Sequence, residues 1–193
     1  MKKYCLIILA FAGLVACSPP DKPESAKTEA VVNEVNDSLM IVPGKRIGDM
    51  KLGEDMQTLS KLSGDPDESD AAMGGAAYTW FAKHDAAGYR TSVYGHRNMG
   101  MADENILHIK KVLITDPNYK TADGINTGLL ADSIRKKYSL GDSSVYNVER
   151  KPRSFYADLA KGIAFEVDPL TRRCTAISIF APNDTASARI NMY

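Results

Sequence analysis

Two parts of the chain share one order of local patterns, and this internal similarity constrains the fold more than any other feature of the sequence. Residues 47–66 and residues 124–142 each carry a short entry, a glycine, a helix-like run and then a Gly-Asp pair. Superposing Gly53 on Gly128 sets an offset of 75 residues (128 − 53), and the same offset places Leu59 on Ile134 and Trp80 on Phe155. Self-similarity at a fixed spacing predicts a repeated supersecondary unit.

The later part of each unit follows a strand pattern. Residues 88–93 match residues 162–167 at an offset of 74, and residues 112–118 match residues 177–183 at an offset of 65. The smaller offset indicates one insertion in the first unit, at residues 95–105. Side chains in the matched stretches alternate with a period of two, which is typical of strands with one buried face.

Each unit also carries the signals of one brief helix. Gly53 and Gly128 permit the turn into the helix, and Gly64 and Gly141 stand where a left-handed C-terminal stop is expected. The helical faces are formed by Met56, Leu59 and Leu62 in the first unit and by Leu130, Ile134 and Tyr138 in the second.

These patterns predict an α+β fold, in which two related units, each a helix followed by about three antiparallel strands, form one domain over residues 43–183. The units span about 43–118 and 119–183, and residues 184–193 follow as a C-terminal tail. In the last strand of the first unit the apolar phase changes across Lys110-Lys111, which predicts a β-bulge or an end of pairing.

The first residues read as an export signal. Lys2 and Lys3 precede an apolar run of 12 residues (16 − 5 + 1) at positions 5–16. A bilayer-spanning helix needs about 20 apolar residues, so this run is too short to be a permanent span. Its length and flanks are those of a secretory signal peptide.

The end of that run, Leu14-Val15-Ala16-Cys17, resembles the lipobox of bacterial lipoproteins. The resemblance implies cleavage after residue 16, lipid attachment at Cys17 with palmitate-type acyl chains, and a flexible tether over residues 17–42. Ser18 is not the aspartate associated with inner-membrane retention in enterobacterial lipoproteins, so the resemblance favours the outer membrane of the cell envelope over the inner one. The alternative is an ordinary signal peptide that happens to end at a cysteine.

Removal of residues 1–16 takes away two lysines and leaves 22 basic residues (24 − 2) against 24 acidic ones. A net charge near −2 gives no reason to expect nucleic acid or an anionic lipid surface as a partner. Cys174 is then the one cysteine left besides Cys17, so no intramolecular disulfide is expected and an apolar core must stabilise the chain. Free cysteines are usually buried, and we interpret Cys174 as structural.

The residues that carry the repeat also carry a family resemblance. They are Gly53, Leu59, Gly64, Asp65, Pro66 and Trp80, with Gly128, Ile134, Gly141 and Phe155 as second-unit counterparts. The arrangement is similar to the tandem α+β repeat of β-lactamase inhibitory protein and of SmpA/OmlA-type outer-membrane assembly lipoproteins, although the second unit lacks the proline. The resemblance covers about residues 43–183 and implies a non-catalytic protein that binds other proteins through a sheet face.

No pattern in the sequence predicts a catalytic site, a metal site or a cofactor site. His84, His96 and His108 fit no compact ligand spacing, and neither a nucleophile elbow nor a phosphate loop is present. Two alternatives to a binding role stay open. One is a hydrolase that uses His96 or His84 with a loop carboxylate; the other is a small-ligand binder with a pocket between helix and sheet.

Candidate contacts for an envelope protein partner are Trp80, Tyr94, Tyr156, Met99 and Met101. Aromatic residues are enriched at interface hot spots, and methionines in a glycine-rich loop adapt to different surfaces. In a regular strand Trp80 and Phe81 point to opposite faces, so one of them is expected on an open sheet face. Loops or the tether could instead cover that face.

Overall fold

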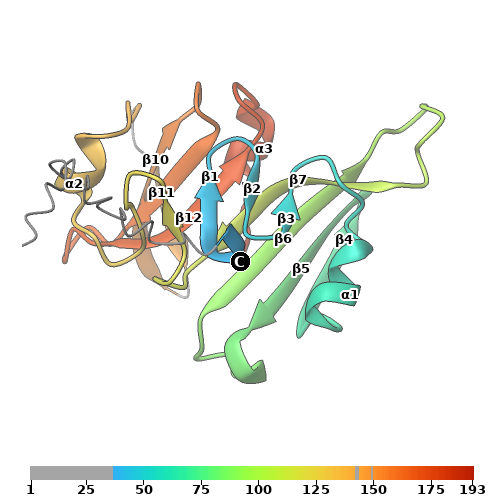
Figure 1. The fold of residues 1–193 in the computed structure, drawn as a ribbon, viewed down its shortest axis with the longest axis horizontal. Helices are drawn as coiled ribbons and strands as arrows, with labels where there is room; N and C mark the ends of the chain where they lie inside the picture. The colour runs from blue at the N-terminus through green and yellow to red at the C-terminus, as the bar shows by residue number, and fades with distance from the viewer. Residues whose placement is uncertain (1–36, 142–143, 149) are drawn as a thin grey trace, which may run out of the picture. The chain divides into compact units, whose positions relative to one another are not determined.

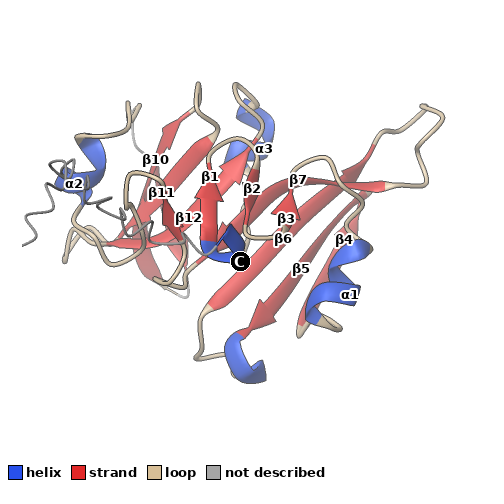
Figure 2. Cartoon of the chain, viewed as in Figure 1, coloured by secondary structure: helices blue, strands red, loops and turns tan. Residues whose placement is uncertain are grey.

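The computed structural model describes residues 37–141, 144–148 and 150–193, and its architecture is mostly β (Figure 2). The α-helices of the described chain are α1 (Thr58–Ser63), α2 (Ala131–Arg135) and α3 (Thr185–Arg189), with six, five and five residues. The α+β prediction is therefore wrong. Helices of about one turn cannot form a layer of their own, and the strands make up the body of the fold.

The main sheet is antiparallel and has the order β4-β5-β6-β7-β12-β11-β10-β9 (Figure 1). Its strands are β4 (Glu68–Ala72), β5 (Gly75–Phe81), β6 (Arg90–Arg97), β7 (Leu107–Ile114), β9 (Ser144–Val148), β10 (Lys151–Asp158), β11 (Ile163–Val167) and β12 (Cys174–Phe180). The two halves of the chain meet where β7 pairs with β12, as in the partners Val112 and Ile179. Both halves thus contribute to one continuous sheet.

Each half supplies four strands to this sheet instead of the expected three. The strand missed in the first half, β4, is exposed along its whole length and lacks an alternating apolar face. It pairs with β5 through a two-residue turn in which Met73 and Gly74 both have positive φ, of 53° and 80°. Two-residue hairpin turns favour this conformation because its twist matches that of the strands.

A second, smaller sheet has the order β3-β2-β1-β8, with strands β1 (Met40–Val42), β2 (Arg46–Ile47), β3 (Met50–Lys51) and β8 (Lys120–Thr121). Single 3₁₀ turns lie at Asp37–Leu39 (η1) and Ala82–His84 (η2). Ile41 and Ile47 of the smaller sheet pack with residues of α1, α2 and the main sheet in one apolar cluster. We call the main-sheet face that carries this cluster the core face.

The glycine and helix signals are confirmed for the first unit. Gly53 has a φ of 85°, Gly64 caps α1 with a φ of 74°, and Met56 and Leu59 are buried in the core. The second unit departs from the expectation at two places. Leu130 is 46% exposed although Ile134 and Tyr138 are buried, and Gly141 does not take a positive φ.

The predicted irregularity at Lys110-Lys111 is confirmed as a bulge. Tyr94 of β6 pairs with Lys111 and Gly95 pairs with Ile109, so Lys110 is an extra residue in β7. The bulge changes which side chains face which side of the strand. Ile109 and Val112 both enter the core, and Lys111 lies on the opposite side of the sheet, which we call the back face.

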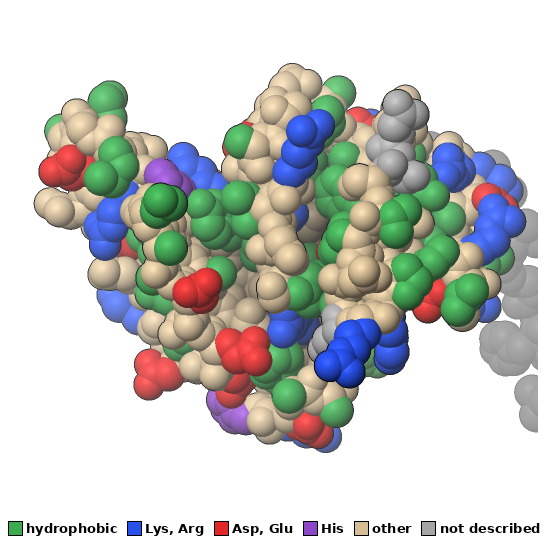
Figure 3. Space-filling view, turned by 180° about the vertical axis from the view of Figure 1, so that it is seen from behind, with side chains coloured by type: hydrophobic (Ala, Val, Ile, Leu, Met, Phe, Trp, Pro, Cys, Tyr) green, Lys and Arg blue, Asp and Glu red, His purple; other side chains and the backbone are tan. Residues whose placement is uncertain are grey.

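Residues 184–193 fold against the back face instead of forming a free tail. Helix α3 contacts β7 and β12. Ala188 packs with Ala164 and Phe180, and Met192 packs with Leu113 and Ala176. Figure 3 shows the molecule from behind, with hydrophobic side chains gathered between charged ones.

Candidate functional site

Trp80 is not on an open face. Its side chain is only 8% exposed and belongs to the main core, where the indole N–H donates to the Gly64 carbonyl oxygen at 3.0 Å. Its neighbour Phe81 points to the other side of the sheet, where the Arg90 guanidinium lies 5.1 Å from the ring centre. Trp80 is therefore a residue of the fold, and it joins the end of α1 to β5.

The other expected partner contacts lie in separate places. Tyr94 is half-buried on the back face beside Leu113 and Met192, and burial raises its pKa. Tyr156 is half-buried under the Arg135 guanidinium, 4.6 Å from its ring centre. Met99 and Met101 lie in the loop between β6 and β7 and are 65% and 64% exposed. The five residues do not form one surface.

The histidines do not converge either. His84 Nδ1 lies 2.7 Å from the Asp67 carboxylate, whose pKa is lowered by the Phe81 backbone N–H and by His84. His108 lies 2.8 Å from the Asp103 carboxylate, while His96 Nδ1 lies 2.7 Å from its neighbour's carbonyl. Within the described ranges, no three His, Cys, Asp or Glu side chains are placed to hold a metal ion. Of the two histidines named in the hydrolase hypothesis, His84 thus pairs with a carboxylate, and His96 contacts a backbone carbonyl oxygen.

Cys174 is buried, as the sequence predicts for a structural cysteine. Its thiol donates to the Ala176 carbonyl oxygen at 3.3 Å. Burial raises the pKa of this thiol, because a thiolate would lose its hydration in the core. A reactive cysteine requires the opposite shift.

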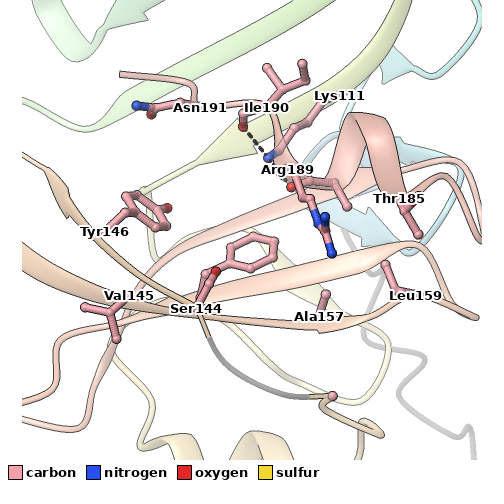
Figure 4. Close-up of a pocket in the computed structure, with 13 residues that line it drawn as sticks. Lys111, Ser144, Val145, Tyr146, Ala157, Leu159, Thr185, Arg189, Ile190 and Asn191 are labelled. Atoms are coloured by element: carbon pink, nitrogen blue, oxygen red, sulfur yellow. Dashed lines mark hydrogen bonds between the residues drawn. The ribbon is translucent and has the colours of Figure 1, made fainter.

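A pocket of about 740 Å³ lies on the back face, between the second half of the main sheet and residues 185–191 (Figure 4). Its lining consists of Lys111, Gly141, Ser144, Val145, Tyr146, Phe155, Ala157, Leu159, Thr185, Ala188, Arg189, Ile190 and Asn191. Apolar side chains, among them Phe155, dominate this lining. Small-molecule sites in proteins have this size and this kind of wall.

Lys111 forms the polar part of the pocket's inner wall. The side chain is only 3% exposed, and its ammonium donates to the carbonyl oxygens of Ala188 and Ile190 at 2.9 and 2.8 Å. It also lies 5.6 Å from the ring centre of Phe155. Burial lowers the pKa of Lys111 to about 8, and the charge of Glu166 opposes this shift. The lysine therefore binds the end of α3 to the sheet.

Glu166 is the acidic counterpart of Lys111 on the back face, but it does not line the pocket. Tyr193 donates to its carboxylate at 2.7 Å. Burial raises the pKa of Glu166, while hydrogen bonds from Tyr146 and Tyr193 and the charge of Lys111 act against the increase. The Glu166 carboxylate thus holds Tyr193, the last residue of segment 184–193, on the back face. Lys111 does the same for the end of α3.

Sequence reasoning missed this site although two signals for it are present. Lys111 stands next to the predicted bulge and directly before the apolar run Val112-Leu113-Ile114, and that position indicates a buried cation. Ala188, Ile190 and Met192 alternate with polar residues, as in an extended segment that packs on a surface. The pocket itself depends on the contact between β10 and residues 185–191, which local patterns do not specify.

Comparisons with known proteins leave the family open. No family model matches the chain, and no curated protein matches it. One similar solved structure is a cysteine-rich secretory protein from Staphylococcus aureus subsp. aureus Mu50, with 17% identity, a TM-score of 0.46, and coverage of 75% of this chain and 50% of that one. Another is an extracellular protein containing an SCP domain from Bacillus anthracis str. Ames, with 12% identity, a TM-score of 0.42, and coverage of 68% and 44%. The chain thus spans half or less of the length of these proteins.

In the described part of the chain, no helix has both the length and the apolar composition needed to cross a bilayer. The lipid-attachment residue predicted from the sequence, Cys17, lies outside the described residues.

Proposed function

We propose that this protein is an exported, lipid-anchored, non-catalytic binding protein that holds a ligand with an apolar body in the back-face pocket. The observation that carries the proposal is the pocket of about 740 Å³ with its mainly apolar wall. Contact with Phe155, Ala157 and Leu159 would stabilise an apolar ligand by removing its surface from water, at about 25 cal/mol per Å².

A binding role suits the polar groups of the pocket better than catalysis does. Catalysis by Lys111 would require a free amine, and two carbonyl oxygens already accept hydrogen bonds from its ammonium. Ser144 also lines the pocket, but no histidine or carboxylate stands among the described residues of the lining to act as its base.

The proposed location rests on the sequence. The signal pattern of residues 1–16 and the lipobox resemblance at Cys17 support export and attachment to a membrane, with the outer membrane favoured by Ser18. Two or three acyl chains bind a bilayer far more firmly than the marginal binding of a single chain.

The proposal is tested with N-phenyl-1-naphthylamine, a neutral fluorophore that brightens in apolar sites. The protein is expected to bind it in one saturable site. Ala157→Trp fills the pocket and should abolish this binding, while Ala71→Trp, on the exposed strand β4, is the matched control and should not. Absence of saturable binding, or equal binding by the Ala157→Trp variant, would overturn the proposed function.

A second candidate, contact with an envelope protein, is favoured by the exposure of Met99 and Met101 at one loop. Crosslinking in intact cells should then capture a partner that the variant with both methionines changed to serine fails to capture. Equal capture by the variant would exclude this loop as the contact.

A further inference from the structure

We propose that the ligand of the back-face pocket is a single-chain aliphatic carboxylate whose head group binds Arg189 beside Lys111. This inference rests on the proposed function and adds the charge and the orientation of the ligand.

The first argument is the charge of the pocket lining. Its described residues include two cationic side chains, Lys111 and Arg189, and neither an aspartate nor a glutamate. Glu166, which interacts with Lys111, has its carboxylate engaged by Tyr193 and Tyr146. An anionic group on the ligand would meet attraction inside the pocket, and a cationic group would meet repulsion.

The second argument is the state of Arg189. Among the described residues, no hydrogen bond or ion pair engages its guanidinium. By contrast, Arg90 donates to the Met192 carbonyl oxygen and to Glu68, and Arg172 donates to Asp132. Arg189 has five N–H donors in a planar fork, which matches the two oxygens of a carboxylate.

The third argument is the direction in which the Arg189 side chain points. Figure 4 shows the Arg189 side chain reaching from α3 across the pocket toward Ala157. A ligand whose head group meets the guanidinium can place its chain along Phe155 and Ile190. Lys111 donates two of its three N–H groups to carbonyl oxygens, which leaves one N–H and a positive charge on the inner wall.

The donor count selects a carboxylate over a phosphate monoester. A phosphate monoester carries nearly two negative charges and three strong acceptor oxygens. The cationic donors of the pocket are one arginine fork and one lysine N–H. Ser144, Thr185 and Asn191 add neutral donors, and most of the remaining wall is apolar. A carboxylate has one charge and two oxygens, and the fork alone satisfies both.

The inference is tested by calorimetric titration of the whole protein with dodecanoate and with dodecanol at pH 7. Dodecanoate is expected to bind about tenfold more tightly, which corresponds to about 1.4 kcal/mol for a charge-assisted contact. Arg189→Gln should remove this preference, and Arg189→Lys should restore part of it. Arg172→Gln, an exposed arginine outside the pocket lining, is the control and should change neither affinity.

The outcomes separate the two claims. Equal affinity for the acid and the alcohol, or a preference that survives in Arg189→Gln, would overturn the head-group assignment while the proposed function stands. If neither compound binds and the neutral fluorophore does not bind either, the proposed function falls and this inference falls with it.

Discussion

Lys111 places a cation among apolar side chains that disfavour its charge. The hydrogen bonds that its ammonium donates explain what it contributes there. The two carbonyl oxygens at the end of α3 have no partner within a helix of five residues, and the ammonium supplies hydrogen bonds to both. Its position in β7 follows from the extra residue Lys110. One bulge therefore determines how the back face holds residues 184–193.

This arrangement predicts a pH dependence of stability. The pKa of Lys111 is about 8 in the folded protein against 10.5 in the unfolded chain, so between these values the unfolded chain binds more protons. The contribution of Lys111 to the free energy of unfolding should then rise with pH above about 8, by at most about 3 kcal/mol. Urea unfolding at pH 7, 8, 9 and 10 measures this contribution as the difference in stability between the wild type and Lys111→Met.

Above about pH 9 other buried groups change the stability in the opposite direction, because burial also raises the pKa of the Cys174 thiol. Burial raises the pKa values of Tyr94, Tyr119, Tyr138, Tyr146 and Tyr193. In the unfolded chain the tyrosines lose their protons near pH 10, before the buried tyrosines of the folded protein do. The free energy of unfolding therefore falls as the pH increases. A difference between the wild type and Lys111→Met that stays constant from pH 8 to 10 would show that Lys111 keeps an ordinary pKa.

Trp80 gives a second test at the scale of the residue. As a core residue that also binds the Gly64 carbonyl oxygen, it should lower the free energy of unfolding by about 3 kcal/mol or more when changed to alanine. Phe81→Ala, on the opposite side of β5, is the comparison and should have a smaller effect. A Trp80→Ala variant with wild-type stability in urea would restore the interpretation of Trp80 as a surface contact.

At the scale of the element, the short motifs were predicted and the edge strands were not. The turns at Gly53 and Gly128, the α1 stop at Gly64 and the bulge at Lys110 follow from local chemistry, because a positive φ or a change of apolar phase leaves a mark on a few residues. Strand β4 leaves no such mark, since its residues are all exposed and its pairing is determined by β5. The α+β prediction was wrong because α1 and α2 have only six and five residues, too few to form a helical layer on the sheet.

The superposition of Trp80 on Phe155 in the sequence is a second case in which local patterns did not determine the structure. Trp80 lies on the core face, whereas Phe155 contacts Lys111 and lines the back-face pocket. Strand side chains alternate between faces, so an alignment error of one residue exchanges core and surface. Aromatic identity alone could not detect this error, and the candidate site was missed with it.

Residues 184–193 provide the test for this scale. Met192 is 5% exposed and covers Leu113 and Ala176, while Met99 is 65% exposed in a loop. Met192→Ala should reduce the free energy of unfolding by about 2 kcal/mol, within the range for buried methionines, and Met99→Ala should leave it nearly unchanged. Urea unfolding compares the two, and equal effects would mean that this segment does not pack on the sheet in solution.

At the scale of the whole molecule, attachment to a membrane must come from the N-terminus if the proposal is right. A net charge near −2 after removal of residues 1–16 gives the chain no general attraction to anionic lipid. Cys17→Ser should therefore abolish incorporation of labelled palmitate and move the protein from the membrane fraction to the soluble fraction. Cys174→Ser, the matched cysteine change, should preserve the label. Labelled protein that persists in the Cys17→Ser variant would place the lipid elsewhere, and a protein that stays on the membrane without label would require a second contact with the envelope.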